Sequence, residues 1–337
     1  MKNTVPNFIE YLLTPAAYPH PATEIKLVQT HISYVVLAGD FVYKLKKPVD
    51  FGFLNFTTLD QRRHFCEREL VLNRRLCPDL YLGMVTIAEE EGRLNLDGRG
   101  SVVEYGVKMR RMPEEKMMGR IIGSGGLTRE MLDRIVAILV PFYGQAEATS
   151  EINSFGRPEA VGVNVRENFD QTEGFIGCSA LSREQFEIIN HYTLDFLARE
   201  GLFAVRMTEG RIRDCHGDLY SANICLTESV QIFDCIEFNE RFRYCDIASD
   251  VAFLAMDLDF HGLPELSRYF IDSFVALSGD SGLLTMLDFY KCYRAYVRGK
   301  IGLFTAHAPE VDEETRQGCL DQASRYFALA EGYAVIG

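Results

Sequence analysis

The chain has 337 residues, of which 47% are hydrophobic and 25% are charged. This composition indicates a globular protein with one large core or two lobes, and it excludes a disordered chain. The 35 Lys and Arg residues against 48 Asp and Glu residues give a formal charge of -13, and no basic run could follow a phosphate backbone. We therefore expect no nucleic-acid partner. An acidic surface suits a cationic substrate, although solvation alone is the simpler explanation.

The sequence also carries information about the compartment. The first 21 residues lack a basic segment followed by an apolar core, and no later stretch approaches about 18 apolar residues without a charge. We expect a cytoplasmic protein with no membrane partner and with reduced thiols. Four of the nine cysteines recur every ten residues, but zinc ligands normally come in closer pairs, so we interpret these four as small buried hydrophobes. They are Cys215, Cys225, Cys235 and Cys245.

The first third of the chain predicts a small sheet with one helix. Residues 30–47 read as two strands joined by a turn at residues 38–40. Thr58 and Gln61 form a capping-box pattern that predicts a helix to about Leu76. Glu69 lies within an otherwise apolar stripe of that helix, so we expect it to have a charged partner. Three further strands are expected at residues 82–87, 93–96 and 102–109.

Helical periodicity dominates after about residue 110, with helix starts at Thr128 and at the capping box of residues 182–185. Strands followed by helices suggest two lobes. We expect an N-terminal lobe at residues 1–108 that begins with a short helical extension, a hinge at 109–113 and a C-terminal lobe at 114–337. The glycine-rich residues 123–126 follow no strand and lack the lysine of a P-loop, so we interpret them as a linker between helices.

One strand-rich segment, residues 211–238, interrupts the helical half. It contains His216-Gly217-Asp218, then Asn223, then an apolar hairpin that ends at Asp234. Phosphoryl transfer from a nucleotide needs one carboxylate to orient the acceptor hydroxyl, an amide and a second carboxylate to hold magnesium, and a lysine on the phosphates. The chain supplies all of these groups in a workable order.

Asn223 follows Asp218 by five residues, and the Ile-Phe-Asp sequence that ends at Asp234 follows Asn223 by eleven. On this motif and spacing the chain resembles the aminoglycoside phosphotransferase and choline kinase family. The resemblance covers residues 30–300 and implies an α+β, protein-kinase-like fold of two lobes. The first would be a small, mainly antiparallel β lobe with one key helix, and the second a larger helical lobe with a catalytic β-hairpin. It implies that Asp218 is the catalytic base and that Asn223 and Asp234 bind magnesium. Cys235 follows Asp234 where protein kinases carry Phe, which argues against an ordinary protein kinase.

The same resemblance places a phosphate-binding lysine on the third strand. Lys44 and Lys46 share one face of that strand by alternation, and we favour Lys44. Its ion-pair partner would be Glu69, with Glu67 as the other candidate. A glycine-rich loop is absent, so Ser33 and nearby backbone amides would contact phosphate instead.

Met109 and Met112, at the expected hinge, would contact the nucleotide. The nucleotide would be ATP, with GTP as the alternative, together with Mg²⁺. The acceptor would be a hydroxyl group of a small molecule such as an amino sugar, an amino alcohol or a sugar-like compound, and it could be cationic. Two other hypotheses stay open: phosphoryl or nucleotidyl transfer to a protein, and a catalytically silent nucleotide-binding module. The absence of a P-loop motif indicates a bacterial branch without the second domain of some relatives. The sequence leaves the oligomeric state open.

Four other features have structural interpretations. We expect His216 to hold the loop backbone, and Asp246 to be a helix N-cap. Asp250, in the first turn of that helix, is most simply an acid favoured by the helix dipole, and it could also hold the catalytic loop or bind a substrate amine. Residues 290–300 alternate aromatic and basic side chains, which we interpret as a partly buried aromatic face with solvated basic residues rather than a stacking platform.

Overall fold

The structure, a computed structural model, describes residues 5–309 and 311–336. These residues form two compact units. The first unit comprises the chain up to Arg120 together with Asn223–Glu240, and the second comprises Ile121–Ala222 and the chain from Arg241 onward. The hairpin after Asn223 thus belongs to the same unit as the amino-terminal residues, while the lobe boundaries expected at residues 108–114 stay a prediction.

The first unit is built on a six-stranded antiparallel sheet, in the order β1-β2-β3-β6-β4-β5. Its strands are β1 (Ile25–Gln29), β2 (Ser33–Ala38), β3 (Phe41–Lys46), β4 (Tyr81–Glu90), β5 (Arg93–Leu96) and β6 (Ser101–Arg110). The other elements are α1 (Asn7–Leu12), η1 (Pro15–Ala17), α2 (Leu59–Asn73), η2 (Glu114–Lys116) and the hairpin β8 (Ile224–Leu226) with β9 (Val230–Ile232). The expected hairpin, helix and three further strands are confirmed.

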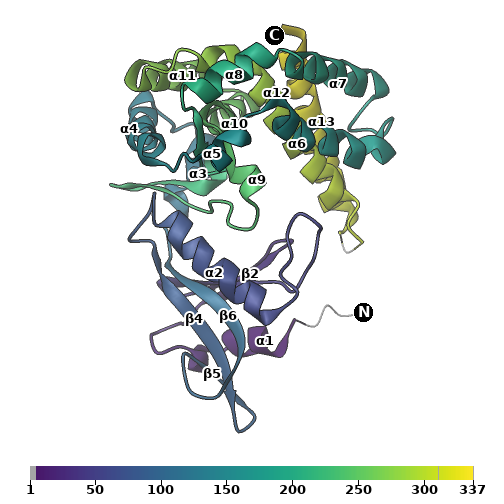
Figure 1. The fold of residues 1–337 in the computed structure, drawn as a ribbon. Helices are drawn as coiled ribbons and strands as arrows, with labels where there is room; N and C mark the ends of the chain where they lie inside the picture. Colours follow the sequence, from purple (N-terminus) through teal and green to yellow (C-terminus); the bar gives the residue numbers. More distant parts are fainter. Residues whose placement is uncertain (1–4, 310, 337) are drawn as a thin grey trace. The chain divides into compact units, whose positions relative to one another are not determined.

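The sheet has an apolar cluster on each face. One cluster joins α1 to Tyr43 and Leu45 of β3, and the other joins α2 to β4 and β6, with Val42 of β3 packed against it. Figure 1 shows α2 lying along β4 and β6. Because side chains alternate along a strand, Lys44 and Lys46 point to the same face as Val42, which is the face that α2 covers.

The buried face of α2 mixes polar and apolar side chains. The helix begins with the predicted capping box, in which Thr58 accepts a hydrogen bond from the Gln61 N–H, and it ends at Asn73, three residues before the predicted end. Arg62 and Asn73 are buried on it together with Glu69. Such a face is stable only when every polar group finds a partner inside the unit.

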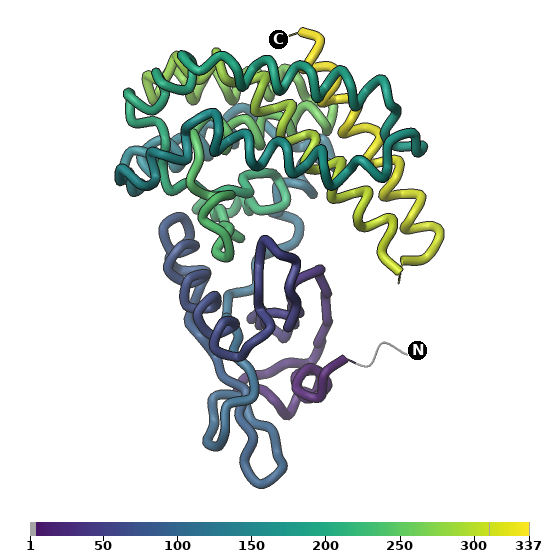
Figure 2. Tube along the Cα trace, turned by 45° about the vertical axis from the view of Figure 1, so that its right-hand side comes forward, coloured from purple at the N-terminus to yellow at the C-terminus, as the bar shows by residue number. Residues whose placement is uncertain are grey.

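The second unit is mainly helical. Its helices are α4 (Arg129–Gln145), α5 (Ser150–Ser154), α6 (Pro158–Thr172), η3 (Glu173–Phe175), α7 (Arg183–Leu197), α8 (Glu200–Thr208), α10 (Ile247–Phe260), α11 (Pro264–Ser278), α12 (Leu283–Ala306) and α13 (Glu313–Ile336). β7 (Ile212–Asp214) pairs with β10 (Tyr244–Asp246). Three short helices, α3 (Met118–Gly123), η4 (Ser221–Asn223) and α9 (Glu240–Arg243), lie where the chain passes from one unit to the other. Helices α12 and α13 lie side by side in Figures 1 and 2.

Several smaller expectations can be compared with this fold. Residues 123–126 connect α3 to α4, as predicted. Cys215, Cys225 and Cys235 are buried, whereas Cys245 is partly exposed. Within residues 5–309 and 311–336, no helix combines the length and the apolar character that crossing a bilayer requires.

The basic residues of α12 correct one expectation. Tyr290 and Tyr296 are buried as predicted, but Lys291 and Arg294 are buried too, so they do not form a solvated face. The ammonium group of Lys291 donates to Asp259 at 2.8 Å, and Arg294 contacts buried acceptors described below. A buried cation is tolerated where a carboxylate compensates its charge, and the sequence around residue 291 gives no sign of that distant partner.

The turn between β2 and β3 yields a stability prediction. Gly39 has a φ of 59°, and a Cβ there would lie 2.5 Å from the carbonyl oxygen of Pro21. Gly52 has a φ of 79° with no atom within 4 Å of such a Cβ, so it is a control for backbone strain alone. Gly52→Ala should lower the unfolding free energy by about 1 kcal/mol, and Gly39→Ala by at least about 2 kcal/mol, in urea unfolding. Equal losses would contradict the close approach at Gly39.

Candidate active site

A single buried carboxylate contacts both lysines of β3. Lys44 Nζ lies 2.8 Å from Glu69 Oε1, and Lys46 Nζ lies 2.9 Å from Glu69 Oε2. Glu67 forms instead an ion pair with Arg63 at 3.0 Å, and both of these side chains are about half exposed. Of the two candidate acids on α2, Glu69 therefore contacts the lysines.

Each lysine has a second carboxylate partner from the segment after β9. Lys44 forms an ion pair with Asp234, and Lys46 forms one with Glu237. We call the series Asp234–Lys44–Glu69–Lys46–Glu237 the charge chain. The Asp234 side chain is 44% exposed and that of Lys44 is 14% exposed, whereas the other three are at most 4% exposed. The charge chain thus runs from a solvent-accessible carboxylate to a buried one.

The proximity of opposite charges keeps the middle of the charge chain ionised. Burial alone would lower the pKa of Lys44, but the carboxylates of Asp234 and Glu69 raise it well above its ordinary value. Burial would raise the pKa of Glu69, but the two ammonium groups outweigh it and lower the pKa to about 2. Glu237 differs, because burial raises its pKa and Lys46 offsets this only in part.

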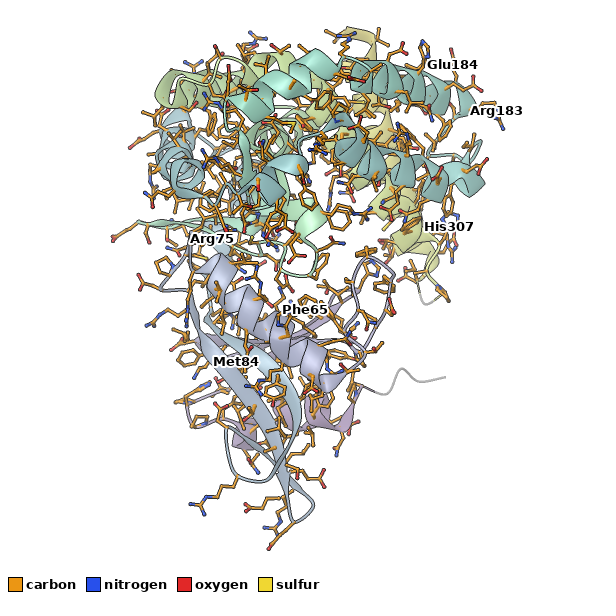
Figure 3. All side chains as sticks on the ribbon, viewed as in Figure 1. Phe65, Arg75, Met84, Arg183, Glu184 and His307 are labelled. Atoms are coloured by element: carbon orange, nitrogen blue, oxygen red, sulfur yellow. The ribbon has the colours of Figure 1, made fainter. Side chains whose placement is uncertain are left out.

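The backbone at Asp234 is held in a strained conformation. Asp234 has a φ of 63°, which is uncommon for a residue with a side chain. Its N–H donates to the Tyr81 hydroxyl at 3.2 Å, and the next N–H, of Cys235, donates to Asn73 Oδ1 at 2.9 Å. Arg75, labelled at the end of α2 in Figure 3, approaches Cys235 Sγ at 3.3 Å. Helix α2 therefore fixes the loop that carries Asp234 as well as the lysines of β3.

The hairpin β8–β9 brings Asn223 and Asp234 to one end of the same structure. Ile224 pairs with Ile232, and the Phe233 N–H donates to the Asn223 carbonyl at 3.0 Å. Carboxylate and amide oxygens suit a hard cation such as Mg²⁺, and the partly exposed Asp234 carboxylate is accessible to one. These two residues fit the metal-binding role that the resemblance implies, although the role itself stays a prediction.

In the second unit, Asp250 organises the loop that contains Asp218. Asp250 is fully buried at the start of α10. Its carboxylate accepts the N–H groups of His216 at 2.7 Å and Gly217 at 2.8 Å, and the hydroxyl of Tyr143 at 3.2 Å. Asp250 is therefore more than a first-turn acid of α10, because its carboxylate holds the backbone of this loop.

The loop is fixed on its other side as well. Arg294 of α12 donates to the Gly217 carbonyl at 2.9 Å, and its guanidinium group lies 3.7 Å from the Asp250 carboxylate. The Asp218 N–H donates to His216 Nδ1 at 3.2 Å, so the buried His216 ring holds the loop backbone as expected. Asp218 itself is only partly buried. This arrangement presents a carboxylate on a rigid loop.

The remaining sequence candidates have these positions. Ser33 begins β2 opposite Lys46, and its buried hydroxyl has no hydrogen-bond partner among the residues that the structure describes. Met109 and Met112 pack in the cluster between α2 and the sheet. Asp246 is the predicted N-cap of α10, accepting the Ala248 N–H at 2.8 Å. Contacts of Ser33 and the two methionines with a nucleotide stay predictions.

Sequence analysis missed Glu237, Asn73 and Arg294. Glu237 carried a signal, because it is an acid inside the apolar run of residues 235–238. Asn73 and Arg294 carried none, since each acts through a contact with a distant segment: Asn73 on Cys235, and Arg294 on Gly217.

Comparisons with known proteins identify the fold. No protein-family model matches the chain. Curated relatives described as uncharacterized proteins from Mycobacterium bovis and Mycobacterium tuberculosis are 36% identical over 287 residues, which is 84% of this chain and 56% of theirs. The chain therefore spans about half the length of the curated relatives it matches.

Solved structures resemble the chain over nearly its whole length. A choline/ethanolamine kinase family protein from Mesorhizobium loti has a TM-score of 0.52 at 11% identity, covering 98% of this chain and 99% of that one. Amicoumacin kinase, solved with AMP-PNP and Ca²⁺, has a TM-score of 0.52 at 10% identity, covering 95% and 92%. APH(2")-IIia, solved with GDP and kanamycin, has a TM-score of 0.50 at 13% identity, covering 96% and 99%. The chain has the kinase-like fold of these proteins, as predicted.

The ionised state of Glu69 can be tested by pH. Its pKa in the folded protein, about 2, lies below the ordinary value of 4.5, so its stabilising contribution is present above about pH 4.5 and is lost as the pH falls towards 2. Between about pH 5.5 and about pH 3.5 the wild type should lose about 1 kcal/mol more unfolding free energy than Glu69→Gln in urea titrations. Glu67→Gln is the matched control and should follow the wild type. Parallel pH profiles for Glu69→Gln and the wild type would contradict the ionised bridge.

Proposed function

We propose that this chain is an ATP- and Mg²⁺-dependent phosphotransferase that moves the γ-phosphoryl group of the nucleotide to a hydroxyl of a small molecule. The observation that carries the proposal is the contact of Lys44 with both Glu69 and Asp234. It joins a sheet lysine, a helix acid and a loop acid, and the hairpin leading to that loop acid begins at Asn223. These are the groups that phosphoryl transfer requires around a nucleotide.

In this proposal each group of the first unit has a separate task. Lys44 binds the α- and β-phosphates, and Glu69 orients its ammonium group. Asn223 and Asp234 hold Mg²⁺, which would supply neutralisation of the charge on the transferred phosphoryl group. Ser33 and the N–H groups near it contact phosphate. Met109 and Met112 contact the nucleotide, for which ATP is preferred over GTP. We also keep a cytoplasmic location as part of the proposal.

Asp218 is the proposed base. It accepts the proton of the acceptor hydroxyl as that oxygen bonds to the γ-phosphorus and the bond from this phosphorus to the β-phosphate oxygen breaks, releasing ADP. The rigid loop matters here, because a base contributes only when it is oriented towards the proton that it removes. Asp250 and Arg294 provide that rigidity through the Gly217 N–H and carbonyl groups. They are positioning residues.

The acceptor is proposed to be small, which agrees with the choline/ethanolamine kinase family and amicoumacin kinase names of two structural neighbours. An amino sugar or amino alcohol remains the first choice. Arg298 of the second unit is a cation whose pKa responds to Asp218. Burial lowers the pKa of Arg298, but the nearby Tyr220, Tyr326 and Asp218 raise it. Because a cation within electrostatic range of the base also suits a neutral or acidic sugar, acceptor pools should contain these too.

The base is tested by γ-phosphate transfer from labelled ATP with Mg²⁺ to pools of amino sugars, amino alcohols, neutral and acidic sugars, and cell extract. Asp218→Asn should bind ATP as the wild type does and lose about 100- to 10,000-fold in turnover. Asp272→Asn, which removes an exposed acid of α11, is the control and should retain activity.

Other outcomes distinguish the rival functions. Normal turnover in Asp218→Asn would refute the assignment of the base. A product that carries the nucleotide, or a labelled protein in the extract, would identify one of the protein-directed alternatives. ATP binding without transfer to any acceptor would support the silent binding module.

The metal ligands are tested by titrating Mg²⁺. Asp234→Asn should raise the Mg²⁺ concentration for half-maximal ATP turnover by at least about 10-fold, because it removes a charged oxygen ligand. Glu228→Gln changes an exposed acid at the tip of the same hairpin and should leave the titration unchanged. An unchanged Mg²⁺ requirement in Asp234→Asn would exclude the carboxylate as a ligand.

A further inference from the structure

The inner half of the charge chain, Lys46 and Glu237, has no task in the proposed transfer. Both side chains are buried, at 1% and 4% exposure, and they contact each other directly. Lys46 also lies 5.0 Å above the ring centre of Phe56. A buried ion pair is seldom a gain in stability over apolar residues of similar size, so its presence beside Lys44 calls for another explanation.

The explanation lies in the number of charges around Glu69. Glu69 has one negative charge and faces two ammonium groups, one on each oxygen. If Glu237 were neutral, Lys46 could be balanced only by Glu69, and Lys44 would depend on Asp234 alone. With Glu237 ionised, the four groups Lys44, Lys46, Glu69 and Glu237 sum to zero. The negative charge of Asp234, which contacts Lys44, then exceeds what the four groups need and can also balance a bound cation.

Glu237 is also placed to act in this way. It lies three residues after Asp234 in the same segment, so the two carboxylates reach the two lysines from one loop. The segment beyond it is fixed, because Asn239 donates to the Phe53 carbonyl at 2.9 Å and Phe238 packs against Phe53 with ring centres 6.1 Å apart.

We propose that Glu237 is a positioning residue that neutralises Lys46 and thereby keeps Glu69 directed at Lys44, so that Lys44 does not depend on Asp234 alone and the partly exposed Asp234 carboxylate can also hold a cation. The inference rests on the proposed function, in which Lys44 binds nucleotide phosphates. The inference predicts that removing Glu237 and removing Lys46 have unequal effects. Loss of Glu237 leaves a buried ammonium group that draws on Glu69, whereas loss of Lys46 leaves a buried carboxyl group that can take up a proton and become neutral.

The test compares Glu237→Gln, Lys46→Met and the double variant by calorimetric binding of Mg²⁺-ATP and of adenosine. Glu237→Gln should weaken Mg²⁺-ATP binding about 10-fold and leave adenosine binding unchanged, since the defect concerns the phosphates. Lys46→Met should weaken Mg²⁺-ATP binding by a smaller factor than Glu237→Gln does. The double variant should regain most of the lost affinity, to within about 3-fold of the wild type, because the unbalanced charge is gone. Glu240→Gln, an exposed acid after the segment, is the control.

The outcomes distinguish a failure of the positioning role of Glu237 from a failure of the proposed phosphotransferase function. Binding by Glu237→Gln equal to that of the wild type, or a double variant as weak as Glu237→Gln, would overturn the positioning role while leaving the phosphotransferase proposal intact. Equal weakening for ATP and adenosine would indicate a structural role only and overturn it too. A Lys46→Met variant that binds Mg²⁺-ATP more weakly than Glu237→Gln does would contradict the predicted asymmetry and overturn the positioning role. Absence of Mg²⁺-ATP binding by the folded wild type would instead refute the proposed function, and the inference with it.

Discussion

The first unit depends on one ionised carboxylate, that of Glu69, on a helix whose buried face mixes polar and apolar side chains. Removing this charge from water is unfavourable, and the two ammonium groups of β3 offset the cost. The interaction therefore constrains both partners: α2 must direct Glu69 towards the sheet, and β3 must carry lysines at alternate positions. The ion pair with Glu69 therefore fixes both the position of Lys44 and the orientation of α2.

The strained loop at Asp234 follows from this arrangement. A left-handed φ at a residue with a side chain costs of order 1–3 kcal/mol and persists only where neighbours enforce it. Here Asn73, at the end of α2, accepts the Cys235 N–H and donates to the Glu69 carbonyl. One helix thus positions both the lysine partner and the loop acid. A change in the position of α2 would disturb the two together.

Local signals explain what the sequence could predict. The capping box at Thr58 and the alternation that puts Lys44 beside Lys46 are decided within a few residues, and the structure shows both. Glu69 was identified as an acid in need of a partner because it interrupts an apolar stripe. By contrast, the contact of Glu237 with Lys46 joins residues 191 positions apart, and that of Arg294 with Gly217 joins residues 77 apart. No local pattern encodes such pairs, so the expectation of solvated basic residues on α12 was wrong.

Each unit contains a buried carboxylate that orients a less buried functional group. Asp250 in the second unit, like Glu69 in the first, is a buried carboxylate whose charge is balanced by neighbouring donors, here two backbone N–H groups and the nearby Arg294. In each unit the group proposed to meet the reactants, Lys44 on the phosphates or Asp218 on the acceptor hydroxyl, is less buried than the group that orients it. This separation has a chemical reason. A group that contacts substrate must exchange partners, whereas a buried carboxylate held by cations or N–H groups cannot move without leaving its charge uncompensated. The supporting carboxylates, Glu69 and Asp250, are therefore buried, and the groups that would meet the reactants are partly exposed.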